Sequence, residues 1–275
     1  MNKIVKDTYV IENKKVNKKI SVLADIHYWS KKDKIKLDKI LAFYESNPCD
    51  FICIPGDFIN DGLPSDSEIF LTFLKDLTNF AKVVISVGNH ETFLYRNKKK
   101  YFKNDKLFEQ ISDIKNVYLL DNDYCEIDKV RFIGVTLPND YYDYHENSNY
   151  FYRYLNNIYD ELPKNLYNVI LCHSPECIRE DIIKNIPLFN NANLVISGHM
   201  HAGVMPRFLR GIAKGKGIIS PYKTFLPKMS YGMFDINNLK LVISPGITKF
   251  SDNCKFFRLF NPLYNMEIVE IELKK

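Results

Sequence analysis

Residues 19–27 read Lys-Ile-Ser-Val-Leu-Ala-Asp-Ile-His, a short apolar run that ends in an aspartate and a histidine. Similar runs occur at 50–54, 82–87, 168–172 and 193–196. Their short length and β-branched composition are typical of strands that are buried on both faces. Each run leads into side chains of the metal-binding type: Asp25 and His27, Asp57, Asn89 and His90, His173, and His199 and His201.

Helical patterns lie between the first three runs, at residues 33–44 and 66–80, where apolar side chains recur at helical spacing. A strand, helix, strand order predicts parallel β-α-β crossovers. In open α/β sheets, ligands bind beyond the carboxyl ends of the strands. We therefore expect all five runs to point to one edge of a sheet, where Asp25 and His201 would meet.

The later part of the chain predicts a second, more antiparallel sheet. Its strands are expected at residues 130–136, 231–236, 239–244 and 266–273, with a tight turn at 237–238. Residues 1–17 are expected to add a strand or hairpin at an edge. The prediction is an α/β protein in which two sheets pack face to face with helices outside, as a single domain over residues 1–275.

Five of the six histidines lie in the segments that follow the strands. Imidazole and carboxylate ligands suit Mn, Fe and Zn, and a carboxylate can bridge two cations, a role for which Asp57 is placed. Two such cations clamp a phosphoryl group and lower the pKa of bound water. The residues therefore predict a site with two divalent or trivalent metal ions and hydrolysis of a phosphoester.

Composition excludes several other classes of protein. The chain has 275 residues with a net charge of +5, and no run approaches the roughly 18 apolar residues of a membrane span. The N-terminus has no apolar signal segment, so we expect a cytoplasmic protein with peripheral membrane contact as an option. The six cysteines form no CxxC pair, which indicates free thiols. The sequence has no long basic stripe of the kind that binds nucleic acid. It also gives no indication of the oligomeric state.

The order D-x-H, G-D, G-N-H-E, H and G-H-x-H between Asp25 and His201 resembles the calcineurin-like metallophosphoesterase superfamily. Within it, residues 172–175 and 197–203 resemble the bacterial branch of small, often membrane-associated phosphoesterases, as do residues 244–247 and 260–262. The resemblance implies a four-layer α-β-β-α sandwich with two packed mixed sheets. That expectation agrees with the two sheets predicted from the strand pattern.

The resemblance also implies a role for each residue of the motifs. A metal-bridging hydroxide would attack in line, and His90 would give a proton to the leaving oxygen. Glu91 would lie behind the ligands, where a histidine ring usually donates to a carboxylate or a carbonyl. The first metal would be held by Asp25, His27 and His201, the second by Asn89, His173 and His199, and both by Asp57.

Several alternatives stay open at the level of sequence. The substrate would be a small phosphoester, nucleotide or lipid-linked, while a nuclease or a non-catalytic scaffold are competing functions. Cys172 is a conceivable thiolate ligand, but its place at the end of an apolar run favours a small core residue. The tyrosine-rich tract at 141–159, which holds His145, could form an aromatic wall or pack on the core. Residues 205–210 could touch a lipid headgroup region, close over substrate or simply connect two strands.

Overall fold

The computed structural model describes residues 3–60, 66–93, 101–137, 141–142, 161–178, 186–247 and 264–275, which form two six-stranded sheets. The first sheet has the order β1-β12-β2-β3-β4-β5. Its strands from β2 to β5 are all parallel, and β12 runs antiparallel to β2 and parallel to β1. Their bounds are Ile4–Glu12 (β1), Met266–Lys274 (β12), Lys18–Val22 (β2), Phe51–Pro55 (β3), Lys82–Ser86 (β4) and Val117–Leu120 (β5).

The second sheet has the order β10-β11-β9-β8-β7-β6 and is mixed, as expected. Its inner strands β11, β9, β8 and β7 are parallel, and only the outer pairs β10-β11 and β6-β7 are antiparallel. The bounds are Gly232–Ile236 (β10), Leu239–Ile243 (β11), Leu194–Ser197 (β9), Tyr167–Cys172 (β8), Val130–Val135 (β7) and Tyr124–Ile127 (β6).

Two expectations about the sheets are wrong. The five runs that precede the candidate ligands do not share one sheet, because β2, β3 and β4 belong to the first sheet and β8 and β9 to the second. The C-terminal strand β12 was expected in the second sheet, yet it lies in the first, where Val269 pairs with Val22 and Ile271 with Ile20. There it has a partner strand on each side, which satisfies its backbone groups.

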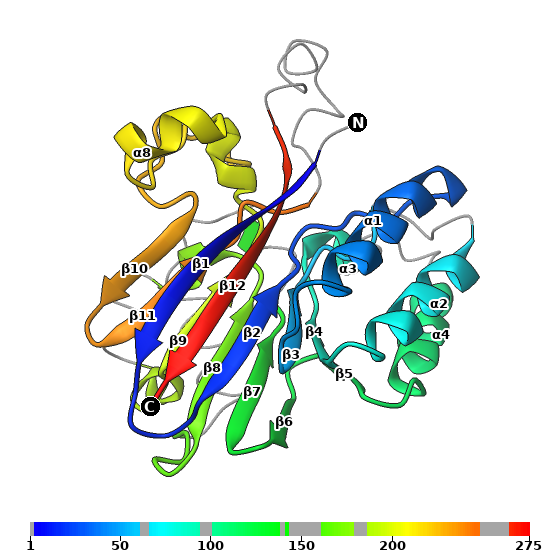
Figure 1. Ribbon diagram of the computed structural model, residues 1–275, viewed down its shortest axis with the longest axis horizontal. Helices are drawn as coiled ribbons and strands as arrows, with labels where there is room; N and C mark the ends of the chain where they lie inside the picture. The colour runs from blue at the N-terminus through cyan, green and yellow to red at the C-terminus, as the bar shows by residue number, and fades with distance from the viewer. Residues whose placement is uncertain are drawn as a thin grey trace.

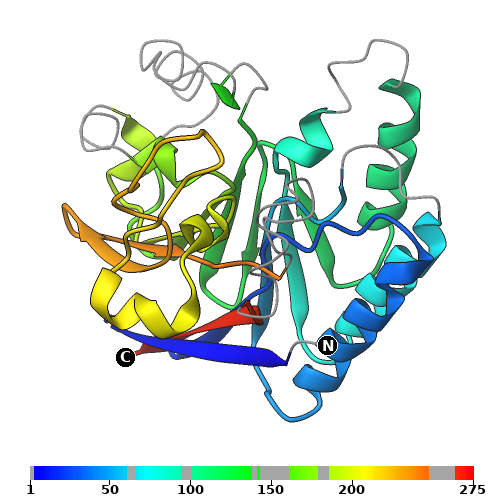
Figure 2. The ribbon, with the colours of Figure 1, turned by 90° about the horizontal axis from the view of Figure 1, so that it is seen from above.

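Three apolar clusters separate the layers. One lies between the two sheets and contains Phe51 of β3 and Phe132 of β7, whose ring centroids are 5.0 Å apart. Another packs the first sheet against the helices α1 (Lys34–Tyr44), α2 (Ser67–Leu77) and α4 (Tyr101–Ser112). Figure 2 shows these helices together on one side of the stacked sheets. The third cluster covers the outer face of the second sheet, so the arrangement fits the predicted sandwich.

The other helical elements are short. They are η1 (Lys31–Asp33), α3 (Asn89–Phe93), η3 (Pro175–Ile178), η4 (Pro187–Phe189), η5 (His201–Val204), η6 (Arg207–Leu209) and α8 (Arg210–Ala213). Among the described residues, no helix has the length and apolar character to cross a bilayer. In Figure 1, β1 and β12 lie side by side in front of the second sheet. The predicted N-terminal edge strand is therefore confirmed as β1.

Candidate metal centre

The candidate ligands occupy the loops that follow β2, β3, β4, β8 and β9 at their carboxyl ends. Five of them have a positive φ, between 44° and 65°. Residues other than glycine rarely adopt this left-handed backbone conformation, and surrounding contacts must hold it in place. Such strain concentrates at functional sites, and five of the sixteen non-glycine residues with positive φ in the described part of the chain are candidate ligands: Asp25, His27, Asp57, His199 and His201.

Asp57 lies at the centre of the cluster and is buried. Its Oδ2 is 2.9 Å from Nε2 of His173, 3.7 Å from Nε2 of His27 and 3.8 Å from Nε2 of His90. Two atoms that bind one ion at roughly 2.1 Å lie about 3 to 4 Å apart. These separations therefore suit ligands that share cations with the Asp57 carboxylate.

The remaining ligands form a group on each side of Asp57. On one side, Oδ1 of Asp25 is 3.7 Å from Nε2 of His201 and 4.0 Å from Nε2 of His27. On the other side, Nε2 of His173 is 3.2 Å from Nδ1 of His199. The first group comes from β2 and β9 and the second from β8 and β9, so the site spans both sheets.

Four buried ligand-type atoms in the described part of the chain have no hydrogen-bond partner: Oδ2 of Asp25, Nε2 of His27, Oδ1 of Asn89 and Nε2 of His199. Leaving buried polar atoms without a partner is costly, and native proteins rarely do so without a reason. Cations would satisfy oxygen and nitrogen donors of this kind. The residues present therefore fit the metal ions that the sequence predicts.

His173 is held in a defined orientation. Its Nδ1 is 2.8 Å from the carbonyl oxygen of Pro55, which can only accept, so Nδ1 carries a proton. Nε2 then faces Asp57. Burial alone would lower the pKa of His173, but the charge of Asp57 and the hydrogen bond to it raise the pKa to about 10. A proton on Nε2 thus occupies the position in which a metal ligand needs a free lone pair.

Three other groups, His199, His27 and Asp57, have the charge states that metal binding requires, whereas burial raises the pKa of Asp25. Burial lowers the pKa of His199, and the neighbouring His173 lowers it further. Burial also lowers the pKa of His27. Both rings are therefore neutral at pH 7. Burial opposes ionisation of Asp57, yet the charges of His173 and His90 hold the pKa of its carboxyl well below the usual range.

Glu91 holds the loops that carry the ligands. Its carboxylate accepts hydrogen bonds from the backbone N–H groups of Asp57 at 2.9 Å, Ile59 at 2.9 Å and Gly88 at 2.7 Å. Burial and then the charge of Asp57 raise the pKa of Glu91 to about 7. The sequence placed Glu91 behind the ligands, but these bonds to the backbone were not predicted.

His90 lies at the more open side of the centre. Its side chain is 20% exposed, compared with 9% for His27 and 11% for His201. Its backbone N–H donates to Oδ1 of Asp57 at 2.9 Å, and its ring meets that of His27 edge-on, with centroids 4.4 Å apart. This placement suits contact with a bound phosphoryl group. His27, Asp57 and His90 are also close enough to form a third group of metal-binding atoms.

Glycines leave room for the two buried carboxylates. A Cβ on Gly88 would lie 2.3 Å from Oδ1 of Asp57, and a Cβ on Gly198 would lie 2.7 Å from Oδ2 of Asp25. Gly246 packs on Asp25 in the same way, with a Cβ 2.9 Å from the same oxygen. The sequence identified residues 244–247 only as part of a resemblance, because no motif links them to Asp25.

Two tyrosines adjoin the second group of ligands. The ring centroid of Tyr142 is 5.3 Å from that of His199, and the centroid of Tyr222 is 5.0 Å from it. The hydroxyl of Tyr222 lies 3.0 Å from Oγ of Ser174. Tyr142 belongs to the aromatic tract predicted at 141–159, whose residues from 143 onward, with His145, lie outside the described residues. Tyr222 was not predicted, since it follows no recognisable strand.

Cys172 is not placed as a ligand. It is buried in the outer cluster of the second sheet, and its thiol points to the carbonyl oxygen of Ser174 at 3.6 Å. Within the described residues, it joins none of the groups that could hold a metal. This agrees with the alternative in which Cys172 is a small core residue.

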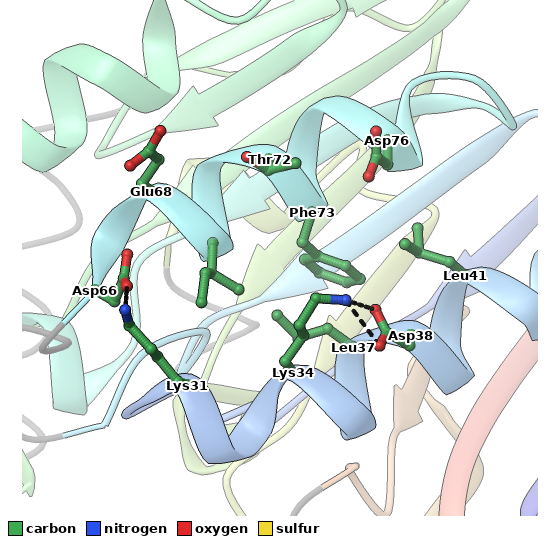
Figure 3. Close-up of a pocket in the computed structure, with 11 residues that line it drawn as sticks. Lys31, Lys34, Leu37, Asp38, Leu41, Asp66, Glu68, Thr72, Phe73 and Asp76 are labelled. Atoms are coloured by element: carbon green, nitrogen blue, oxygen red, sulfur yellow. Dashed lines mark hydrogen bonds and ion pairs between the residues drawn. The ribbon is translucent and has the colours of Figure 1, made fainter.

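A hollow of about 350 Å³ lies elsewhere, between α1 and α2 (Figure 3). Ion pairs cross or border it, between Lys31 and Asp66 at 3.0 Å and between Lys34 and Asp38 at 2.7 Å. Its lining includes Phe73 but none of the candidate ligands. The lining of this hollow offers paired charges and no converging metal-binding groups. We therefore expect catalysis at the candidate ligands, which follow the carboxyl ends of the strands.

The chain matches the model of a known protein family. The model of the calcineurin-like phosphoesterase family matches residues 18–203, which include all the candidate ligands. The chain belongs to this family, and the superfamily expected from the motifs is confirmed. The matched region runs from β2 to η5 and thus covers both groups of ligands.

The chain is also similar to two bacterial proteins described as uncharacterized metallophosphoesterases. The one from Helicobacter pylori is 26% identical over 67% of this chain and 45% of its own length. The one from Campylobacter jejuni is 24% identical over 96% of this chain and 61% of its own length. The chain therefore spans about half to three fifths of the length of these relatives.

Among solved structures, a dimetal phosphatase from Danio rerio aligns with a TM-score of 0.35 and 11% identity. The alignment covers 83% of this chain and 87% of the zebrafish protein.

Proposed function

We propose that the chain is a metal-dependent phosphoester hydrolase with a centre for two cations. The observation that supports this most strongly is the position of Asp57, whose Oδ2 lies within 3.8 Å of ring nitrogens of His27, His90 and His173. One carboxylate oxygen between two groups of ligands is the arrangement that lets two cations lie close together. Membership of the calcineurin-like phosphoesterase family supports the same proposal.

The cations, when bound, would supply Lewis acidity and lower the pKa of water at the site. The chain would contribute the ionised Asp57, the neutral rings of His27 and His199, and loops held by Glu91. His90 would contact the phosphoryl oxygens from the open side and give a proton from its ring to the leaving oxygen. General acid catalysis of this kind typically increases the reaction rate by about 10²-fold to 10⁴-fold, and we propose a contribution of this size from His90.

The substrate we propose is a small phosphoester that carries a planar or apolar group, such as a nucleotide or a lipid-linked phosphate. Tyr142 and Tyr222 support this, because their rings flank His199 next to the ligands. Aromatic rings offer a large apolar surface with a polar hydroxyl at its edge. The net charge of +5 is modest, and the sequence has no long basic stripe of the kind that binds a nucleic acid strand.

Hydrolysis of bis-p-nitrophenyl phosphate and p-nitrophenyl phosphate with added Mn²⁺, Fe²⁺ or Zn²⁺ tests the proposal. We expect turnover of at least one ester that requires added metal and is lost on chelation. The control is Ile35→Ser, at a side chain on α1 that is 52% exposed and is not a candidate ligand, which should not change the rate. If the metal-loaded protein hydrolysed neither ester with any of the three metals, this result would contradict a hydrolytic function and favour a non-catalytic scaffold.

A further inference from the structure

Large apolar side chains are exposed mainly in one segment of the chain. Among the described residues, ten such side chains are exposed, and six of them lie between residues 208 and 226. We call residues 205–231, between η5 and β10, the insert. Its exposed apolar side chains are Phe208 at 70%, Leu209 at 38%, Ile212 at 84%, Ile218 at 41%, Phe225 at 77% and Leu226 at 69%.

The insert is also basic, because it contains six lysines and arginines and no aspartate or glutamate. Its four lysines are all exposed, and within the described residues none of them takes part in an ion pair shown by the structure. A patch with exposed apolar groups and one sign of charge is unusual on a protein that is surrounded by water alone. The four lysines are Lys214, Lys216, Lys223 and Lys228.

The two arginines of the insert serve a different purpose. Arg207 pairs with Asp7 and with Glu267, at 2.7 Å from the glutamate, and Arg210 pairs with Glu267 at 2.6 Å. These pairs fasten η6 and α8 to β1 and β12. With Arg207 and Arg210 turned toward the protein, Phe208 and Ile212 on the same helical turns face outward. Lipid contact was one of the options left open for residues 205–210; their two arginines form ion pairs within the protein, and the lysines of the insert remain available.

The second half of the insert is a short hairpin. The N–H of Leu226 donates to the carbonyl oxygen of Ile218 at 3.0 Å, and Phe225 pairs with Ile219 in an antiparallel bridge. Ile218 thus lies across from Leu226, and Phe225 is the neighbour of Leu226 on the same arm of the hairpin. The N–H of Ile218 also donates to the carbonyl oxygen of Gly203 in η5 at 2.7 Å. The hairpin is therefore fixed to the segment that begins with His201.

We propose that the insert is a docking surface for an anionic phospholipid bilayer. Apolar side chains would enter the boundary between headgroups and acyl chains, and the lysines would meet anionic headgroups, each contributing on the order of fivefold in affinity. Cores of protein interfaces are depleted in lysine, which disfavours a protein partner. Nucleic acid is disfavoured because four of the six exposed apolar side chains are aliphatic and offer no ring on which a base could stack: Leu209, Ile212, Ile218 and Leu226.

The position of the insert connects the bilayer surface to the metal centre. Tyr222 lies in the hairpin next to Lys223, and its ring is 5.0 Å from that of His199. In Figure 1 the yellow segment around α8 lies at the end of the molecule toward which β2 points, where the ligand loops begin. A bilayer that binds the insert would therefore lie beside the site. Docking itself does not depend on the proposed hydrolysis.

Flotation with vesicles tests this proposal on the full chain. Vesicles of phosphatidylcholine alone are compared with vesicles that contain phosphatidylglycerol, at low and at high salt. We expect binding to the anionic vesicles that weakens at high salt. Phe225→Ser with Leu226→Ser should abolish it, and glutamine at Lys214, Lys216, Lys223 and Lys228 should weaken it on the order of 100-fold or more.

Matched controls change the same chemistry elsewhere on the surface. They are Val10→Ser with Ile35→Ser, two exposed apolar sites, and glutamine at the exposed Lys32, Lys106, Lys115 and Lys129. Both should float like the wild type, and thermal unfolding should show that every variant is folded. The proposal is overturned by no flotation with anionic vesicles, by equal loss in the controls, or by tighter binding of single-stranded DNA that the insert variants abolish.

Discussion

Asp57 and His90 are neighbours in space with different proposed tasks. Asp57 is buried and shared by both groups of ligands, whereas His90 is partly exposed and touches Asp57 through its backbone N–H. The geometry alone also allows His90 to join His27 and Asp57 around a cation. Metal content and reaction rate, measured on the same variant, separate these two roles.

Replacing His90 is expected to reduce turnover without releasing metal. His90→Ala should lower kcat on the order of 10² to 10⁴-fold, because a proton donor is lost, while the metal content stays at the wild-type level. Elemental analysis and steady-state kinetics on the loaded protein check this. A variant that loses metal in proportion to activity would make His90 a ligand instead.

Glu91 is expected to matter for stability as much as for metal binding. In Glu91→Gln an amide NH₂ replaces one oxygen, so it cannot accept from every backbone N–H that Asp57, Ile59 and Gly88 now offer. One buried donor left without a partner costs about 1 to 3 kcal/mol. Chemical denaturation of the metal-free protein should show a loss in this range. Unchanged stability would mean that the loops are held by other contacts.

His173 makes metal affinity depend on pH. In the metal-free protein its pKa is raised from 6.5 to about 10, so it stabilises the fold fully below pH 6.5, and this contribution is lost as pH rises through 10. A cation must displace the proton, so affinity should rise with pH between these values. Titration with Mn²⁺ at several pH values should give a dissociation constant that falls by up to about tenfold per pH unit. A constant that does not change with pH would contradict this protonation state.

At the scale of elements, the loops are shaped by what packs behind the ligands. Gly198 lies between β9 and His199, and it leaves room for the carboxylate of Asp25 in the neighbouring loop. Five ligands adopt positive φ, so these loops have little freedom to adjust. Small additions at the glycines should therefore displace a ligand.

Gly198→Ala is expected to weaken the first group of ligands. The new Cβ would lie 2.7 Å from Oδ2 of Asp25, too close for contact, so the carboxylate or the loop must move. Overpacking of this kind costs typically about 1 to 3 kcal/mol. We expect a lower unfolding midpoint and weaker metal binding, whereas Gly211→Ala, at a glycine with open space around it, should change neither. Wild-type metal affinity in Gly198→Ala would count against this packing.

The strands that carry ligands could be predicted to within one or two residues, because their apolar runs are continuous and end at polar residues. β5 and β6 were not predicted; each has only four residues, and unlike the equally short β9 neither is followed by a candidate ligand. The candidate ligands were found because each follows a strand. The hydrogen bonds of Glu91 and the contact of Tyr222 with His199 depend on tertiary packing, which leaves no local signal.

At the scale of the whole molecule, the site depends on how the two sheets pack. Asp25, His27 and Asp57 come from the first sheet and His173, His199 and His201 from the second. The sequence predicted converging strands on one sheet, because strand patterns carry no information on which sheet a strand joins. The cluster between the sheets, which includes Phe51 and Phe132, therefore sets the relative position of the two halves of the site.

The central claim is that Asp57 serves two cations at once, and metal stoichiometry tests it most directly. After loading with Mn²⁺ and removal of free metal, elemental analysis should find two ions per wild-type chain. Asp25→Asn should retain one ion, because only one group of ligands contains Asp25, whereas Asp57→Asn should retain less than one. One ion in the wild type, or one ion kept in full by Asp57→Asn, would contradict the account.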